Sequence, residues 1–142
     1  MLRRHEATGC YDCPEYQAAV LKFYTRHLCR LDPWPEGLER SFAGMSVDVY
    51  RSMWGPSEFG PLTGTLKGWD VTARLPEIRV PSLLTAGRHD EATPDQMTEM
   101  AAAMPDAEVH IFKRSSHLAF YEEMEAYLGL LRGFLRRFDA VA

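Results

Sequence analysis

The most informative stretch of the sequence is Val80-Pro81-Ser82-Leu83-Leu84-Thr85-Ala86-Gly87, a short apolar run that stops at a glycine. Apolar runs of this length, without alternating polar residues, are typical of strands buried on both faces of a parallel sheet. Pro81 should mark the beginning of the strand, because proline cannot donate a ladder hydrogen bond. The run therefore predicts a strand over residues 82–86 of an α/β fold.

A helix, a second strand and another helix are expected after this run. Thr93-Pro94-Asp95-Gln96 combines a capping residue, a first-turn proline and a glutamine three residues after the cap, which indicates a helix N-terminus. Residues 108–112 have a strand pattern, and residues 122–138 have the apolar spacing of an amphipathic helix. Together these elements predict a βαβα unit with parallel strands and a right-handed crossover.

The first part of the chain has a helical pattern instead. Apolar spacing predicts helices over residues 14–30, 35–42 and 47–54. Between Met53 and Gly68 there are four glycines and two prolines, too many for the interior of an element, so we expect a connecting loop there. We divide the chain accordingly into a helical portion, residues 1–60, and an α/β segment, residues 61–142.

The composition limits the kind of protein this is. The chain has 142 residues, of which 46% are hydrophobic and 25% charged, as expected for about one globular domain. The net charge is −4 and the 16 Lys and Arg residues are scattered along the chain, so the sequence does not indicate a basic surface for binding nucleic acid. No run approaches the ~20 apolar residues of a membrane span, and the first residues lack a secretory apolar region. We expect a cytoplasmic protein without nucleic-acid or membrane partners.

Three cysteines cannot all be paired in disulfides, which favours a reducing compartment. Cys10-x-x-Cys13, with His27 and Cys29 downstream, could supply four zinc ligands. The second pair would lie inside a predicted helix with one residue between its members, which is poor geometry for a tetrahedral site. We therefore expect ordinary cysteine packing rather than a metal centre.

Two polar residues stand out at the strand ends. Asp90 follows the first predicted strand and His117 follows the second. Because parallel strands end at the same edge of a sheet, where ligands gather in open α/β sheets, we expect these two side chains to be neighbours. A carboxylate that orients an imidazole is the acid and base part of a hydrolytic triad, and the order Asp then His is that of α/β-hydrolases.

Several motifs in one order resemble the proline iminopeptidase family of α/β-hydrolases, most closely its tricorn-interacting aminopeptidase branch. The resemblance runs from about His5 to Phe138. The motifs that carry it are His27-Leu28-Cys29-Arg30, Asp32-Pro33-Trp34-Pro35-Glu36, Met53-Trp54-Gly55-Pro56-Ser57-Glu58-Phe59, Gly64-x-Leu66-Lys67-Gly68-Trp69-Asp70, Val80-Pro81-x-Leu83-x-x-x-Gly87-x-x-Asp90-Glu91-x-x-Pro94 and Ser116-His117-Leu118.

The resemblance implies the C-terminal part of an α/β-hydrolase fold, a portion of the helical cap followed by the last two strands. It also implies a serine aminopeptidase, without cofactor or metal, that removes an N-terminal proline or small apolar residue from peptides. Asp90 and His117 then resemble the triad acid and base. Glu58 and Glu91 resemble the acids that bind the free amino terminus. Trp54 and Phe59 could line a proline-sized pocket, although an aromatic residue beside a Gly-Pro loop more often has only a packing role.

The family's nucleophile has no counterpart in this sequence. The nearest match to G-x-S-x-G is Gly44-Met45-Ser46-Val47-Asp48, which lacks the second glycine and follows no predicted strand. Ser115 and Ser116 are adjacent to His117, where in-line proton transfer is unfavourable. We therefore expect the chain to act as a truncated hydrolase completed by another polypeptide, or alternatively as a non-catalytic binding or self-associating remnant.

The predicted sheet is too small to be covered by this chain alone. The strand at residues 82–86 would normally pair with a further strand, so one edge is expected to be open. Open apolar edges join other chains, and two-fold arrangements are the commonest. We expect a homo-oligomer, or association with the missing N-terminal half, rather than a stable monomer.

Overall fold

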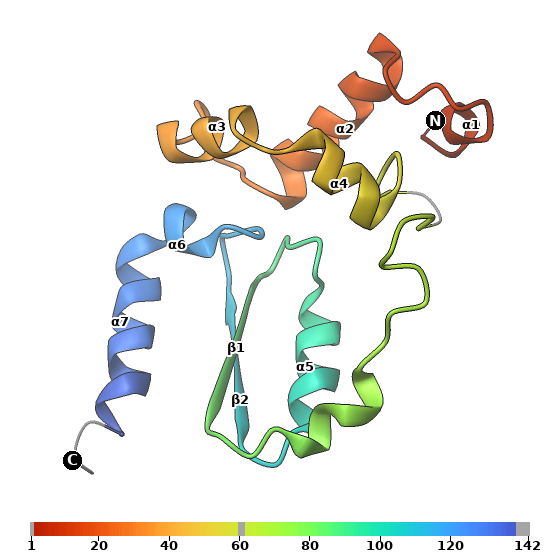
Figure 1. Cartoon of the computed structure of the whole chain (residues 1–142). Coiled ribbons are helices and arrows are strands. Elements are labelled where there is room, and N and C mark those ends of the chain that lie inside the picture. The colour runs from red at the N-terminus through yellow and green to blue at the C-terminus, as the bar shows by residue number, and fades with distance from the viewer. Residues whose placement is uncertain (1, 60–61, 139–142) are drawn as a thin grey trace. The chain divides into compact units, whose positions relative to one another are not determined.

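The computed structural model describes residues 2–59 and 62–138 (Figure 1). The chain divides into two compact units. Unit 1 comprises Met1–Tyr24 and Pro33–Val71, and unit 2 comprises Thr25–Asp32 and Thr72–Ala142. The elements in chain order are α1 (Leu2–Ala7), α2 (Pro14–His27), α3 (Glu36–Ala43), α4 (Val47–Trp54), the 3₁₀ helix η1 (Thr72–Glu77), β1 (Ser82–Gly87), α5 (Pro94–Ala103), β2 (Ala107–Phe112), α6 (Ala119–Glu122) and α7 (Met124–Arg136).

Unit 1 is helical, as the apolar spacing predicts. Helices α3 and α4 lie within one residue of their expected bounds, and α4 begins after Ser46, whose hydroxyl accepts a hydrogen bond from the backbone N–H of Val49. The described residues between Trp54 and Thr72 contain no helix, in agreement with the glycine- and proline-rich loop. Helix α1 was not foreseen from the sequence.

Helix α2 ends at His27, three residues before its expected end at residue 30. The carbonyl oxygens of His27 and Leu28 accept hydrogen bonds from the backbone N–H groups of His117 and Leu118, both at 3.1 Å. The N–H of Arg30 donates to the Glu122 carboxylate at 2.7 Å. The backbone after His27 therefore bonds to the segment that follows β2 instead of continuing the helix.

Unit 2 contains the expected parallel pair of strands. Strands β1 and β2 pair in parallel, with Ser82 opposite Ala107 and Gly87 opposite Phe112, so both strands end at the same edge. Figure 1 shows α5 and α7 on opposite sides of this pair. The α/β class and the strand, helix, strand, helix order predicted from the sequence are confirmed.

The helix of the crossover has the predicted start. Thr93 accepts from the backbone N–H of Gln96, and the Gln96 side chain accepts from the N–H of Thr93 at 2.9 Å, which together form a capping box. This arrangement satisfies two of the otherwise unpaired donors at the helix N-terminus. Buried Phe112 of β2 packs against Tyr127 of α7, with 5.7 Å between ring centroids.

The C-terminal helix differs from the expectation of one continuous element over residues 122–138. It is broken at Glu123, which has φ −132° and ψ 48° between α6 and α7. The Glu123 carboxylate accepts hydrogen bonds from the backbone N–H of Arg114 at 2.9 Å and from the Ser115 hydroxyl at 2.6 Å. These contacts to the loop that follows β2 outweigh the local helical pattern. Among the described helices, none is long and apolar enough to cross a bilayer.

Candidate active site

Asp90 and His117 lie within hydrogen-bond distance at the shared edge of the strands, as predicted. The Nδ1 atom of His117 is 2.9 Å from Oδ1 of Asp90. A carboxylate oxygen accepts, so Nδ1 carries the proton and the lone pair of the neutral ring is left on Nε2. The Asp90 side chain is 3% exposed, whereas that of His117 is 44% exposed. A buried acid thus orients an imidazole that is open to solvent, which is the arrangement of a general base.

The Asp90 carboxylate is itself held by the backbone of its own loop. Oδ1 accepts from the N–H of Ala92 at 2.8 Å, and Oδ2 accepts from the N–H of Gly87 at 3.3 Å. With the imidazole N–H, three donors therefore surround the carboxylate. Both oxygens are engaged, which prevents Asp90 from rotating away from His117.

The end of β1 lies against the backbone of the loop that carries His117. A Cβ atom built on Gly87 would lie 2.2 Å from the carbonyl oxygen of Ser116 and 2.3 Å from that of Ser115. The N–H of His89 also donates to the Ser115 carbonyl at 3.0 Å. Glycine at position 87 is thus what allows the two strand-end loops to approach closely enough for the acid and the imidazole to meet.

Two consecutive glutamates tie the His117 loop to α6 and α7. One oxygen of Glu122 accepts from both the N–H and the hydroxyl of Ser116, at 2.6 and 2.8 Å. Glu123 accepts from the Ser115 hydroxyl and from Arg114, and the Ser115 hydrogen bond is the largest of the effects that lower the pKa of Glu123. Nothing in the local sequence pattern indicated this role for Glu122 or Glu123.

The last residue of α2, His27, completes the support of the same edge. His27 accepts from the N–H of His117 through its carbonyl, and its ring Nδ1 donates to the His89 carbonyl at 2.8 Å. Desolvation and the positive charges of Arg30 and Arg88 lower the pKa of His89, which favours its neutral form. From the sequence, His27 was considered as part of a family motif and as one of four possible zinc ligands, whereas its support of His117 is a tertiary contact.

The three serines considered as nucleophiles all have structural roles. Ser46 caps α4 in unit 1, so Gly44-Met45-Ser46-Val47-Asp48 is not a strand-to-helix elbow. The hydroxyls of Ser115 and Ser116 donate to Glu123 and Glu122, and both residues are fully buried. Each hydroxyl is therefore engaged with a partner other than the His117 imidazole.

Glu58 lies in an aromatic environment within unit 1. Its Oε1 accepts from the Tyr24 hydroxyl at 2.5 Å. Burial, followed by the charge of Glu58, raises the pKa of Tyr50 to about 12. Phe59 packs on Phe23 and Tyr24, with ring centroids 5.0 and 5.7 Å apart. A half-buried carboxylate bordered by aromatic rings is suited to a cationic amine.

The remaining predicted substrate residues are Glu91 and Trp54. Glu91 is exposed in the loop between β1 and α5, directly after Asp90. Trp54 is half-buried at the end of α4, where its carbonyl accepts from the N–H of Thr63 at 3.3 Å. The structure thus brings Asp90 and His117 together in unit 2 and places Glu58, Trp54 and Phe59 in unit 1.

The four zinc ligands considered from the sequence do not form a group. Within the part of the chain that the structure describes, the grouping of metal-ligating side chains is His5, Cys10 and Cys13, all half-buried in unit 1. Cys29 is buried in unit 2, and burial raises the pKa of its thiol. His5 was not foreseen as a neighbour of the two cysteines.

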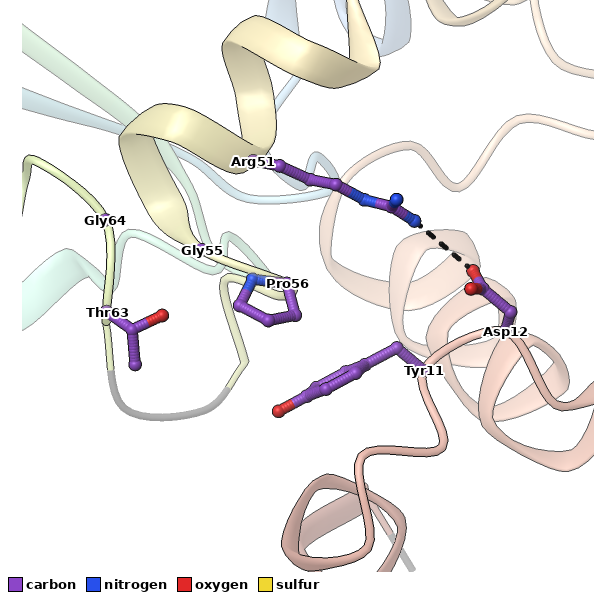
Figure 2. Close-up of a pocket in the computed structure, with 7 residues that line it drawn as sticks. All are labelled: Tyr11, Asp12, Arg51, Gly55, Pro56, Thr63 and Gly64. Carbon is purple, nitrogen blue, oxygen red and sulfur yellow. Dashed lines mark ion pairs between the residues drawn. The ribbon is translucent and has the colours of Figure 1, made fainter.

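Unit 1 also contains a cavity of about 380 Å³, shown in Figure 2. Its lining residues are Tyr11, Asp12, Arg51, Gly55, Pro56, Thr63 and Gly64. Asp12 and Arg51 form an ion pair across it at 3.5 Å. None of the predicted catalytic or substrate residues lines this cavity, so it does not belong to the acid and base site.

Comparison with known proteins identifies the relatives of the chain. It matches no protein-family model. It is 42% identical over 135 residues to a proline iminopeptidase of Heyndrickxia coagulans, a match covering 94% of this chain and 46% of that protein. The crystal structure of proline iminopeptidase from Mycobacterium smegmatis superposes with a TM-score of 0.86 at 40% identity, over 98% of this chain and 47% of that one.

The crystal structure of VinJ gives a TM-score of 0.87 at 38% identity, over 96% of this chain and 46% of that chain. The chain spans about half the length of these relatives. The expected fold is confirmed, because the similarity in structure extends over nearly all of this chain. In sequence and in structure, the chain matches the C-terminal half of the proline iminopeptidase family of α/β-hydrolases.

Proposed function

We propose that the chain supplies the acid, the base and the amine-binding acids of a serine aminopeptidase of the proline iminopeptidase type. The substrate is a peptide with a free N-terminal proline or small apolar residue. The observation that supports this best is the hydrogen bond between buried Asp90 and solvent-exposed His117 at the edge where the parallel strands end. Residues 1–60 then correspond to a cap portion and residues 61–142 to the hydrolase core.

In the proposed reaction, the imidazole of His117 is the general base. Its Nε2 takes the proton of a serine hydroxyl as that oxygen attacks the peptide carbonyl, and later gives the proton to the leaving amine. Asp90 maintains the tautomer with the proton on Nδ1 and stabilises the imidazolium that forms. The serine and the oxyanion donors lie outside these 142 residues, in a part equivalent to the other half of the relatives' length.

Glu58 and Glu91, the two acids to which the family resemblance assigns this role, bind the free amino terminus of the peptide substrate. Glu58 is half-buried beside Tyr24 and Phe59, so its charge is only partly screened by water. Glu91 adjoins Asp90 in sequence, which supports a place for it near the scissile bond. A charge-assisted hydrogen bond from an ammonium group to either carboxylate favours peptides with a free amino terminus over blocked ones.

The direct test is reconstitution with a polypeptide equivalent to the first half of the Heyndrickxia coagulans relative. The chain alone should not hydrolyse proline arylamides, and the mixture should. Asp90→Asn and His117→Ala should each lower kcat by about 10⁴-fold, because the base loses its orientation or is removed. Ser46→Asn keeps a capping side chain at α4 and is the matched control, with activity unchanged.

The amine-binding role of Glu58 and Glu91 is tested by comparing substrates with and without a free amino terminus. Glu58→Gln and Glu91→Gln should raise KM for free-amine substrates and leave the hydrolysis of N-blocked esters unchanged. Equal losses on both substrate types would refute the amine-binding assignment while leaving the role of His117 intact. Activity of the chain alone that is abolished by a serine-directed inhibitor would refute the proposal that these residues lack the nucleophile.

A second candidate function is a non-catalytic module that binds itself or another protein. Exposed apolar side chains on α7 support it: Met124, Leu128 and Leu135 are 50%, 37% and 50% exposed. These positions lie on one side of the helix at spacings of four and seven residues. If a stable complex with the first-half polypeptide forms but remains inactive, this second function is favoured over the peptidase.

A further inference from the structure

The first turn of the chain after α1 brings a histidine and a cysteine together. Gly9 has φ +69°, and its N–H donates to the Glu6 carbonyl at 3.0 Å, while the N–H of Cys10 donates to the His5 carbonyl at 2.9 Å. This pair of bonds is the Schellman motif, in which the residue after the left-handed glycine packs against the residue five positions earlier. The end of α1 thus places the side chain of Cys10 beside that of His5.

Cys13 joins them from the beginning of the next helix. It directly precedes α2, and its carbonyl accepts from the N–H groups of Tyr16 and Gln17 at 3.0 and 3.1 Å. Its Sγ is 3.3 Å from Nδ1 of His5 and donates to the Cys10 carbonyl at 2.9 Å. One ligand atom from each of His5, Cys10 and Cys13 lies within 4.8 Å of the others.

The separation between Cys13 Sγ and His5 Nδ1 is close to that in a tetrahedral zinc site, and Cys10 Sγ lies within 4.8 Å of both. With Zn–S bonds of about 2.3 Å and Zn–N bonds of about 2.0–2.1 Å, tetrahedral angles put two sulfurs about 3.8 Å apart and a sulfur and a nitrogen about 3.6 Å apart. The observed 3.3 Å between Cys13 Sγ and His5 Nδ1 needs only a small side-chain rotation to match. Both cysteines are free thiols, so both sulfurs are available to a metal.

The loop between the two cysteines is held from outside the cluster. Tyr11 packs edge-on against Tyr16, with ring centroids 5.7 Å apart, and Asp12 pairs with Arg51 of α4 at 3.5 Å, as Figure 2 shows. Tyr16 is buried, bonds to Glu6 and Ser57, and also packs edge-on against His5 at 6.4 Å. Because Tyr11 and Asp12 are engaged elsewhere, the two thiols are kept on the side of His5 before any metal binds.

We propose that His5, Cys10 and Cys13 form a zinc site in unit 1, separate from the proposed peptidase chemistry. Two sulfurs and one imidazole nitrogen are the ligand types that Zn²⁺ selects over Mg²⁺ and Ca²⁺. On binding, each thiol loses its proton to solvent and forms a Zn–S bond, while neutral His5 donates its Nδ1 lone pair, so no electron is transferred. The half-buried position leaves the fourth coordination place to a water molecule.

The test is a titration of the reduced, metal-free full chain with Zn²⁺, followed by competition with a chromogenic chelator. One ion should bind per chain. His5→Ala, Cys10→Ser and Cys13→Ser should each weaken binding by about 100-fold or more, since loss of even an outer partner of a ligand costs about 10- to 100-fold. Cys29→Ala and His110→Ala remove the same side-chain types outside the cluster and should leave the affinity unchanged.

A second measurement on the unmodified chain does not depend on the folding of any variant. Co²⁺ bound in place of Zn²⁺ should show thiolate-to-cobalt charge-transfer absorption and the intense visible bands of tetrahedral coordination. The proposal is overturned if the reduced chain binds no zinc at micromolar concentration, if all three ligand variants bind as well as the wild type, or if the cobalt spectrum lacks thiolate absorption. A chain that forms only a Cys10–Cys13 disulfide and binds no metal when reduced overturns it equally.

Discussion

The α-carbon of Gly87 lies against the backbone of Ser116, so that a Cβ atom there would be 2.2 Å from the Ser116 carbonyl oxygen. The neighbour is backbone rather than a flexible side chain, and it cannot move without moving His117. Asp90 and His117 therefore meet because a residue without a side chain ends β1. The proposed acid and base site depends on this backbone contact as much as on the side chains of Asp90 and His117.

Gly87→Ala should accordingly destabilise unit 2 by about 1–3 kcal/mol, the usual cost of overpacking, and separate His117 from Asp90. Urea denaturation measures the loss, and the hydrogen-bonded Nδ1–H resonance of His117 reports the separation. Gly133→Ala is the matched control, because nothing lies within 4 Å of its Cβ position and it is exposed on α7. The control should be stabilised by about 0.5–1 kcal/mol. Equal stability of the two variants would contradict the argument.

Local signals predicted the elements that carry the site. The Thr93 and Gln96 capping pair marked the start of α5, and the apolar run before Gly87 marked β1. The meeting of Asp90 and His117 followed from the rule that parallel strands end at one edge. These features depend on neighbours in sequence or on general topology, so a single sequence is enough to infer them.

The features that sequence reasoning missed depend on particular tertiary contacts. The break at Glu123 arises from its bonds to Arg114 and Ser115, which no helical pattern records. The approach of His5 to Cys10 depends on a left-handed turn at Gly9, and the sequence pattern directed attention to Cys29 instead. Specific contacts at loops and helix ends, even between residues only five to nine positions apart, are therefore the part of this molecule that sequence reasoning did not capture.

Glu123 should make stability depend on pH in the acid range. The Ser115 hydroxyl, followed by the backbone N–H of Arg114, lowers the pKa of Glu123 in the folded state below the ordinary value of 4.5. Its ionised form therefore favours folding above pH 4.5, and this contribution is lost as pH falls through the lower folded-state pKa. Urea denaturation between pH 3 and 7 measures this contribution to the free energy of unfolding, because the range extends to both sides of the ordinary carboxyl pKa of about 4.5.

Glu123→Gln should accordingly reduce the free energy of unfolding most at neutral pH. The difference from wild type should shrink as pH falls through the lowered folded-state pKa of Glu123, below which both chains are uncharged at this position. Glu125→Gln, an exposed first-turn acid of α7, is the control. A difference between wild type and Glu123→Gln that stays constant across this range would mean that the Ser115 contact does not stabilise the ionised carboxylate.

Tyr50 should report on the charge of Glu58. Burial, then the Glu58 charge, raises the pKa of Tyr50 from 10.0 to about 12. The folded chain keeps this proton where the unfolded chain has lost it, so stability falls as pH rises from about 10 to 12. Subtracting the absorbance titration of Tyr50→Phe from that of the wild type isolates the ionisation of the Tyr50 phenol. Glu58→Gln should move this titration to lower pH, whereas Glu15→Gln, an exposed acid of α2, should not.

The sheet edge predicts association with other chains. Within the described residues β1 pairs with β2 alone, so one side of β1 has no strand partner. Apolar side chains are exposed on α7 as well, and burying such surface with an unpaired strand edge favours association over a monomer.

Light scattering coupled to size exclusion should give a mass above 16.2 kDa at micromolar concentration. Hydrogen exchange should show the outer β1 amides losing protection on dilution, while those bonded to β2 stay protected. A monodisperse 16.2 kDa species with concentration-independent protection would instead mean that the edge is stable without a partner.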